Sequence, residues 1–217
     1  MKRIYAFIIG LCVTTIMNAQ TGEQTSNVIK VNGGLDFVTS KMYLPENLYY
    51  GNQIVAHSWR PGVSVSADYE HLWKSGWGVG VNFIYTDTRY SAKGHIVNQQ
   101  TNEHEKISLS LTTVYIGPSV VYGGTFGGHW RAECALGMGY GQLGGRLADN
   151  GGFAIMSKGG IEYMINSHIG VGVELNSLVV FTKDEELEEF KKYYPSESDV
   201  SSGVSHAGVA AGLRFHF

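Results

Sequence analysis

The sequence predicts an all-β protein that folds as one eight-stranded antiparallel up-and-down β-barrel. Three observations lead to this fold class. Eight segments alternate between apolar residues and small or polar ones, which gives each strand one apolar face. Long polar connections alternate along the chain with short turn-like ones, as in hairpins that share a barrel. The last stretch, HAGVAAGLRFHF, keeps its alternation up to Phe217, where the end of a soluble domain usually frays.

The first four segments each have an apolar face. In residues 28–39 this face carries Ile29, Val31, Leu35 and Phe37. In residues 58–70 it carries Trp59, Val63, Val65, Ala67 and Tyr69. Residues 77–87 place Trp77, Val79, Val81, Phe83 and Tyr85 opposite glycines and Asn82. Residues 107–122 set Ile107, Leu109, Leu111 and Tyr115 opposite serines and a threonine, and Pro118 interrupts the second half of this pattern.

The other four segments repeat the pattern. Residues 129–141 carry Trp130, Ala132, Cys134, Leu136, Met138 and Tyr140 on one face. Residues 157–166 set Ile161, Tyr163 and Ile165 against Lys158, Gly160 and Glu162. Residues 168–181 set Ile169, Val171, Val173 and Leu175 against Gly170, Gly172, Glu174 and Asn176. In the closing segment, residues 206–217, the apolar face consists of Ala207, Val209, Ala211, Leu213, Phe215 and Phe217.

The connections fall into two groups. Four of them are expected to be long, namely residues 40–57, 88–106, 142–156 and 182–203. The short ones lie near Lys74 to Gly76, Gly123 to Gly128 and Asn166 to Ser167. Within the last long connection, residues 182–194 read TKDEELEEFKKYY, where Thr182 and Glu185 form a capping-box pattern. This stretch predicts a short helix on a surface loop.

The N-terminal residues predict export. Lys2 and Arg3 precede an apolar stretch that ends at Met17, and a small residue, Ala19, follows. This is the pattern of a secretory signal peptide, and the stretch is shorter than the 18 to 20 apolar residues, roughly, of an anchoring helix. We therefore divide the chain into a signal peptide at 1–19, a short N-terminal segment at 20–27 and the barrel domain at 28–217.

The composition excludes several classes of protein. Charged residues make up 16% of the chain, below the roughly 25% typical of soluble domains, and the formal net charge of -3 provides no basic surface for nucleic acid. With Cys12 in the signal peptide, Cys134 is the single cysteine of the exported chain, so no internal disulfide is expected. We also expect no cofactor and no metal site, since no His, Asp and Glu cluster has the spacing of metal ligands.

Two kinds of barrel fit these strands, and they differ in which face is inside. A soluble lipocalin-like barrel buries the large apolar residues, whereas an outer-membrane barrel presents them to lipid. Here the other face consists mainly of Gly, Ser and Asn, too few charges for a well-solvated surface. Aromatic residues gather at the strand ends, which matches two interfacial girdles: Tyr69, Trp73, Trp77, Tyr122, Phe126, Trp130 and Tyr163 by the short turns, Phe37, Tyr85, Tyr90, Tyr140 and Phe181 by the long loops. The sequence therefore predicts a transmembrane barrel.

The chain resembles the small outer-membrane β-barrel proteins of Gram-negative bacteria, of the OmpX and OmpA-barrel type. Within this group it is similar to Bacteroidetes porin-family sequences. The resemblance rests on the export signal, on YIGPSVVY and GGIEYMIN, and on the ending GLRFHF. It implies location in the bacterial outer membrane, contact with its lipids and lipopolysaccharide, and recognition of Phe217 and Phe215 by the outer-membrane assembly machinery, with Leu213 and Ala211 on the same face. Residues 182–203 depart from the smallest members of the family.

Charged residues on the polar face form the candidate site. They are Asp68, Arg131, Glu133, Lys158, Glu162, Glu174 and Arg214. Charges inside a narrow barrel need partners, because an unpaired buried charge is costly. Their mixed signs favour a lumen plugged by ion pairs over a conducting or gated pathway for ions, since eight strands leave little room beyond side chains.

The histidines suggest an enzyme only weakly. Some small outer-membrane barrels modify lipid A with a histidine, a serine and an acidic residue, but His57 and Ser58 are the single adjacent pair of the right types. His95, His104 and His206 are expected to be loop or rim residues. The prediction is a non-enzymatic outer-membrane protein that supports membrane integrity, or that serves adhesion or contact with a surface or an extracellular partner through its loops. The alternatives are a narrow pore for small solutes or ions and an outer-membrane lipid-modifying enzyme.

Overall fold

A computed structural model describes residues 26–40, 42–44, 54–56, 59–92, 107–145, 150–182 and 203–217 of the protein. Eight long strands account for most of these residues: β1 Ser26–Val38, β4 Trp59–Leu72, β5 Trp77–Ala92, β6 Ile107–Phe126, β7 Trp130–Gly145, β8 Asn150–Met164, β9 Ile169–Val180 and β10 Val204–His216. The short strands β2 Met42–Leu44 and β3 Ile54–Ala56 form a separate two-stranded sheet. The described residues contain no helix long and apolar enough to cross a membrane.

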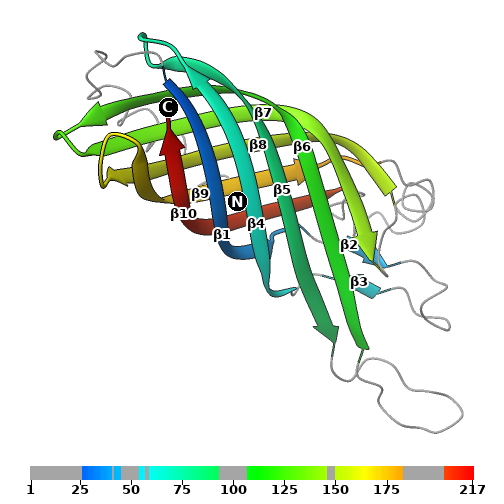
Figure 1. Cartoon of the computed structure of the whole chain (residues 1–217). Coiled ribbons are helices and arrows are strands. Elements are labelled where there is room, and N and C mark those ends of the chain that lie inside the picture. Colours follow the sequence, from blue (N-terminus) through cyan, green and yellow to red (C-terminus); the bar gives the residue numbers. More distant parts are fainter. Residues whose placement is uncertain are drawn as a thin grey trace, which may run out of the picture.

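The eight long strands form one closed antiparallel barrel (Figure 1). Each strand pairs with its neighbour in sequence, and β10 closes the barrel by pairing with β1, from Val28 opposite His216 to Val38 opposite His206. At the end of this seam the backbones of Asn27 and Phe217 exchange two hydrogen bonds of 2.9 and 3.0 Å. Closure leaves no unpaired barrel edge, and the predicted eight-stranded antiparallel up-and-down barrel is confirmed.

The alternation predicts correctly which side chains point outward on most strands. The face predicted for residues 107–122 is wrong: Leu111 and Tyr115 are fully buried inside and Ile116 points outward, because the inner wall is also apolar at this place and both faces of the strand carry apolar residues. The outer wall exposes large apolar side chains along all eight strands, with Leu136, Met138 and Val63 near 60% exposed. Charged and polar residues occupy the alternate positions and are buried inside, as for Lys30 between the exposed Ile29 and Val31. The barrel is therefore apolar outside and largely polar inside, the reverse of a lipocalin-like barrel.

Tight turns join the strands at one end, which we call the turn end. Gly76, Gly127 and Gly128 have positive φ values of 81°, 59° and 82°, a backbone region that other residues rarely adopt. In the turn between β4 and β5 the Gly76 N–H donates to the Trp73 carbonyl at 2.9 Å. The opposite end, where the connections 93–106 and 183–202 attach, is called the loop end.

One predicted loop is largely strand. Residues 142–156 were expected to be a long connection, but β7 continues to Gly145 and β8 begins at Asn150. The glycines in this stretch hide the alternation that places Phe153 outside and Ala154 inside. β6 likewise runs through Pro118 to Phe126, because the missing N–H falls where the register between β6 and β7 is interrupted.

Two strands extend past their neighbours at the loop end (Figure 1). β5 and β6 pair up to Ala92 and Ile107, whereas the pairing of β6 with β7 begins only at Leu111. The predicted helix at 182–194 falls outside the described residues except for Thr182, which is not helical. The predicted signal peptide also lies outside them.

Candidate functional site in the barrel lumen

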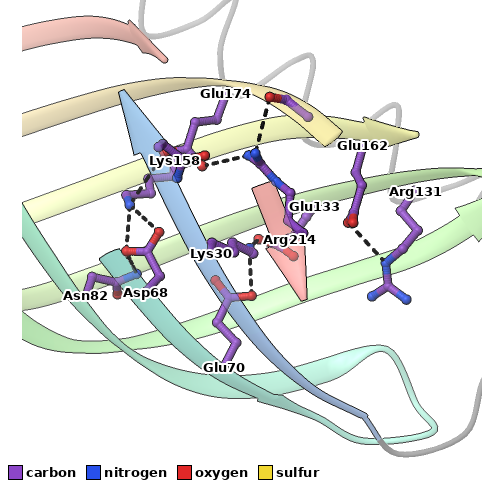
Figure 2. A network of polar contacts seen from close by, with 12 residues as sticks. Lys30, Asp68, Glu70, Asn82, Arg131, Glu133, Lys158, Glu162, Glu174 and Arg214 are labelled. Carbon is purple, nitrogen blue, oxygen red and sulfur yellow. Dashed lines mark hydrogen bonds and ion pairs between the residues drawn. The ribbon is translucent and has the colours of Figure 1, made fainter. Parts of the chain in front are cut away.

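Lys158 of β8 lies at the centre of an ion-pair network inside the barrel (Figure 2). Its Nζ atom is 2.8 Å from both carboxylate oxygens of Asp68, which belongs to β4 on another part of the wall. Asp68 also accepts a hydrogen bond of 2.8 Å from Asn82. On its other side Lys158 is 3.6 Å from Glu174. Side chains from β4, β5, β8 and β9 are thus joined across the lumen.

Lys30 of β1 forms a second bridge. It lies 2.7 Å from Glu70 on the neighbouring strand and pairs with Glu133 of β7, which is not adjacent to β1 in the sheet. Lys30 and Glu70 are buried. A lysine held between two carboxylates keeps its buried charge compensated.

Two arginines extend the network toward the turn end. Arg214 of β10 donates to Glu174 at 3.3 Å and to the Gly172 carbonyl at 3.2 Å. Arg131 of β7 lies 3.8 Å from Glu162, a separation at which the interaction is a weak ion pair. Glu162 is also 2.7 Å from Nε2 of His216.

The lumen charges of the described residues nearly balance. Six carboxylates face four lysine and arginine side chains: Asp36, Asp68, Glu70, Glu133, Glu162 and Glu174 against Lys30, Arg131, Lys158 and Arg214. The carboxylates exceed the cations by two, and two carboxylates, Asp36 and Glu162, each contact a histidine.

The expectation that His206 lies in a loop or at the rim is wrong. His206 belongs to β10 and is 1% exposed. Its Nδ1 atom is 2.5 Å from Asp36 of β1, and its Nε2 atom is 3.0 Å from the hydroxyl of Thr113 on β6. The strand continues through the histidine because Asp36 and Thr113 satisfy the hydrogen-bonding groups of the imidazole.

The Asp36, His206 and Thr113 contacts have the order of a hydrolase triad without its surroundings. All three side chains are buried, and Thr113 is fully inaccessible to solvent. A nucleophile needs room for a reacting atom close to it and to oxyanion donors. The contacts connect β1, β10 and β6 across the lumen.

Two cavities lie on the turn side of the lumen. One, of about 20 Å³, is lined by charged residues of the network, among them Lys30, Glu133 and Lys158. It is large enough for roughly one water molecule. The other, of about 430 Å³, is a wider hollow at the turn end, and Arg131 lines both cavities.

The structure places the residues of the sequence-derived site as follows. Six of the seven charged residues are buried on the inner wall, and the seventh, Glu133, is 17% exposed and points the same way: Asp68, Arg131, Glu133, Lys158, Glu162, Glu174 and Arg214. Phe215 and Phe217 lie on the outer wall at the turn end, 38% and 62% exposed.

Sequence reasoning missed several members of the network. They are Lys30, Asp36, Glu70, Asn82, His206 and His216. Most occupy polar positions of the same alternation, so the period of two was the signal that could have included them. Among the described residues, no group of three His, Cys, Asp or Glu side chains could hold a metal ion.

Comparison with known proteins agrees with the fold. Neisserial surface protein A matches 90% of this chain and all of its own, with 11% identity and a TM-score of 0.51. The outer membrane protein OprG from Pseudomonas aeruginosa matches 91% of this chain and 98% of its own, with 12% identity and a TM-score of 0.51. No family model and no curated protein gives a significant match to the sequence. At these identities the likeness concerns the fold.

Proposed function

We propose that this chain is an integral protein of the bacterial outer membrane, with a plugged polar lumen and no catalytic activity. The observation that carries the proposal is the combination of an exposed apolar wall with a closed, ion-paired interior. A continuous apolar surface of this size is not tolerated in water, and a closed barrel satisfies every backbone group in lipid.

Aromatic residues at both ends of the wall support a membrane position. Exposed aromatic side chains gather at the turn end in Trp73, Trp77, Phe126, Trp130 and Tyr163, and near the loop end in Phe37, Tyr85, Tyr140, Phe153 and Phe181. Outer-membrane barrels carry such girdles where the hydrocarbon meets the headgroups. In this arrangement the turn end faces the periplasm and the loop end faces the exterior, with residues 1–19 removed as a signal peptide.

The work of such a barrel is passive. We expect it to contribute to membrane integrity and to contact lipopolysaccharide, a surface or an extracellular partner through its loops, since recognition concentrates on loops held by a rigid scaffold. Assembly would depend on the outer-membrane assembly machinery acting on the β10 segment that ends in Phe215 and Phe217.

A narrow pore is the second candidate. The observation that favours it is the pair of cavities on the turn side, which share Arg131 and bring water-accessible space close to the middle of the lumen. A path through the network would have to separate Lys158 from Asp68, and ions would have to pass the loop-end contacts of His206.

Three measurements test the proposal. Washing cell envelopes with salt and high pH should leave the protein in the membrane pellet, and detergent should release it, whereas a soluble barrel would leave with the wash. The purified full chain should show no ion steps in planar bilayers; steady steps would favour the pore. Lipid A from cells with and without the protein should have the same mass spectrum, and a changed acylation pattern would indicate an enzyme.

A further inference from the structure

The lumen has two sections of different chemistry. Most ion pairs lie toward the turn end, where there is also a small apolar cluster of Val28, Leu72, Val121 and Ala135. The larger set of buried apolar side chains lies toward the loop end, together with the pair of Asp36 and His206. β8 runs from the loop end to the turn end, so Met156 lies nearer the loop end than Lys158. β9 runs in the opposite direction, so Leu178 lies nearer the loop end than Glu174. The buried apolar residues of the loop-end section are Ile84, Leu111, Tyr115, Leu143, Ala154, Met156, Leu178, Val180 and Val204, each at most 2% exposed.

These apolar side chains form a layer on β8 and β9, whereas Asp36, Ser64, Thr86 and His206 occupy inner positions of the neighbouring walls. Met156 lies opposite Leu178 in the β8–β9 register, and Leu178 lies opposite His206 in the β9–β10 register. The layer extends to β7, where glycines face the lumen. A Cβ atom at Gly137 would lie 2.9 Å from the methyl group of Met156.

A second glycine of β7 shows the same close approach. A Cβ atom at Gly141 would lie 2.6 Å from a methyl group of Val180. Side chains from β8 and β9 therefore occupy the space that side chains of β7 would otherwise fill. The bridge from Asp36 through His206 to Thr113 crosses the same section, between walls that are not adjacent in the sheet.

The ionic section differs in its access to water. Its cavity of about 20 Å³ shares Arg131 with the hollow of about 430 Å³ at the turn end. The side chain of Arg131 therefore borders both the cavity among the ion pairs and the hollow at the turn end. Charged walls keep water and ions solvated, whereas an apolar constriction excludes them by dewetting.

We infer that the loop-end apolar layer, centred on Met156 and Leu178, is the seal of this barrel, and that the ionic section is a hydrated half-channel open toward the turn end. This inference rests on the proposed function, because it assigns the block of a non-conducting lumen to particular residues. An ion that enters from the turn end reaches charged partners, and its passage ends at the layer where no water accompanies it.

The test compares ion conductance in planar bilayers for two variants that each carry two substitutions. Met156→Ser with Leu178→Ser shortens and hydrates the apolar layer, and Asp68→Asn with Lys158→Met removes the central ion pair while keeping its volume. Far-UV circular dichroism of each refolded full chain checks that the barrel has formed. The expected result is discrete ion steps for the first variant and none for the second or for the wild type.

Each other outcome has a definite meaning. Ion steps in the Asp68→Asn with Lys158→Met variant would overturn the inference, whatever the other variant does. A Met156→Ser with Leu178→Ser variant that folds but shows no ion steps would also overturn it. If that variant does not fold, the single change Leu178→Ala is measured by potassium release from proteoliposomes, where release above wild type is expected and its absence overturns the inference. Steps in the wild type would instead refute the proposed plugged lumen, which separates the two failures.

Discussion

Replacing Leu136 with arginine places a cation in the middle of the exposed apolar wall. Leu136 is 61% exposed and lies on β7, six residues after Trp130 and four before Tyr140. A strand rises about 3.3 Å per residue and tilts by roughly 40°, so the girdle residues lie roughly 15 and 10 Å away along the barrel axis. These two distances together match an apolar band of about 25 Å, with Leu136 close to its middle.

The expected cost follows from this depth. An arginine on the lipid-facing wall of an outer-membrane barrel lowers the free energy of unfolding by about 2–4 kcal/mol near the midplane and by about 0–1 kcal/mol at the interface. Ile165→Arg is the matched control, because Ile165 is 58% exposed but lies at the turn end, just after β8. Leu136→Arg should therefore lower the free energy of unfolding by clearly more than Ile165→Arg.

The assay is reversible urea unfolding of the full chain in phospholipid vesicles, followed by fluorescence of its 4 tryptophans. The comparison of two arginines at similar exposure removes the general effect of losing an apolar side chain. Equal costs at the two positions, or no cost at Leu136, would refute the reasoning that this wall faces hydrocarbon.

Three further predictions concern other parts of the barrel. Lys158→Met should destabilise the protein by about 3–5 kcal/mol because Asp68 loses its ion partner, and adding Asp68→Asn should recover most of that loss in a double-mutant cycle of unfolding free energies; additive losses would show that the pair is not coupled. Gly212→Ala should lower the free energy of unfolding by about 1–3 kcal/mol, because its Cβ would overlap the Val31 carbonyl oxygen. The control Gly33→Ala has open space around its Cβ and should change the free energy of unfolding little in the same urea assay. Phe217→Ala should reduce the amount of folded barrel in the outer membrane of cells yet leave unfolding in vesicles nearly unchanged, because the side chain is 62% exposed; equal losses in both would assign Phe217 a structural role.

The strands could be predicted because successive residues of a strand alternate between the outer and the inner wall of the barrel. A period of two with large apolar residues on one face located all eight barrel strands, and the terminal segment revealed the closing strand β10. The rule failed at residues 142–156, where glycines replace the larger residues on both faces and leave no alternation to read. It also gave no sign of the small β2–β3 hairpin, whose strands have three residues each.

The partners inside the lumen were not predictable. Alternation places Lys158 and Asp68 inside, but they meet only because closure of the sheet brings β8 opposite β4 at that height. His206 was misplaced for a related reason, since the partners that stabilise it, Asp36 and Thr113, are 170 and 93 positions away in the sequence. Long-range register is what sets such contacts, and a single sequence does not encode it in any local pattern.

The seam between β1 and β10 dictates the order of events in biogenesis. Because the earliest barrel strand to leave the ribosome bonds to the latest one, from Val28 opposite His216 onward, the sheet has two free edges until synthesis is complete. Those edges and the apolar side chains beside them would aggregate in an aqueous compartment. A chain with the proposed membrane location would therefore have to stay unfolded in transit and close in the bilayer.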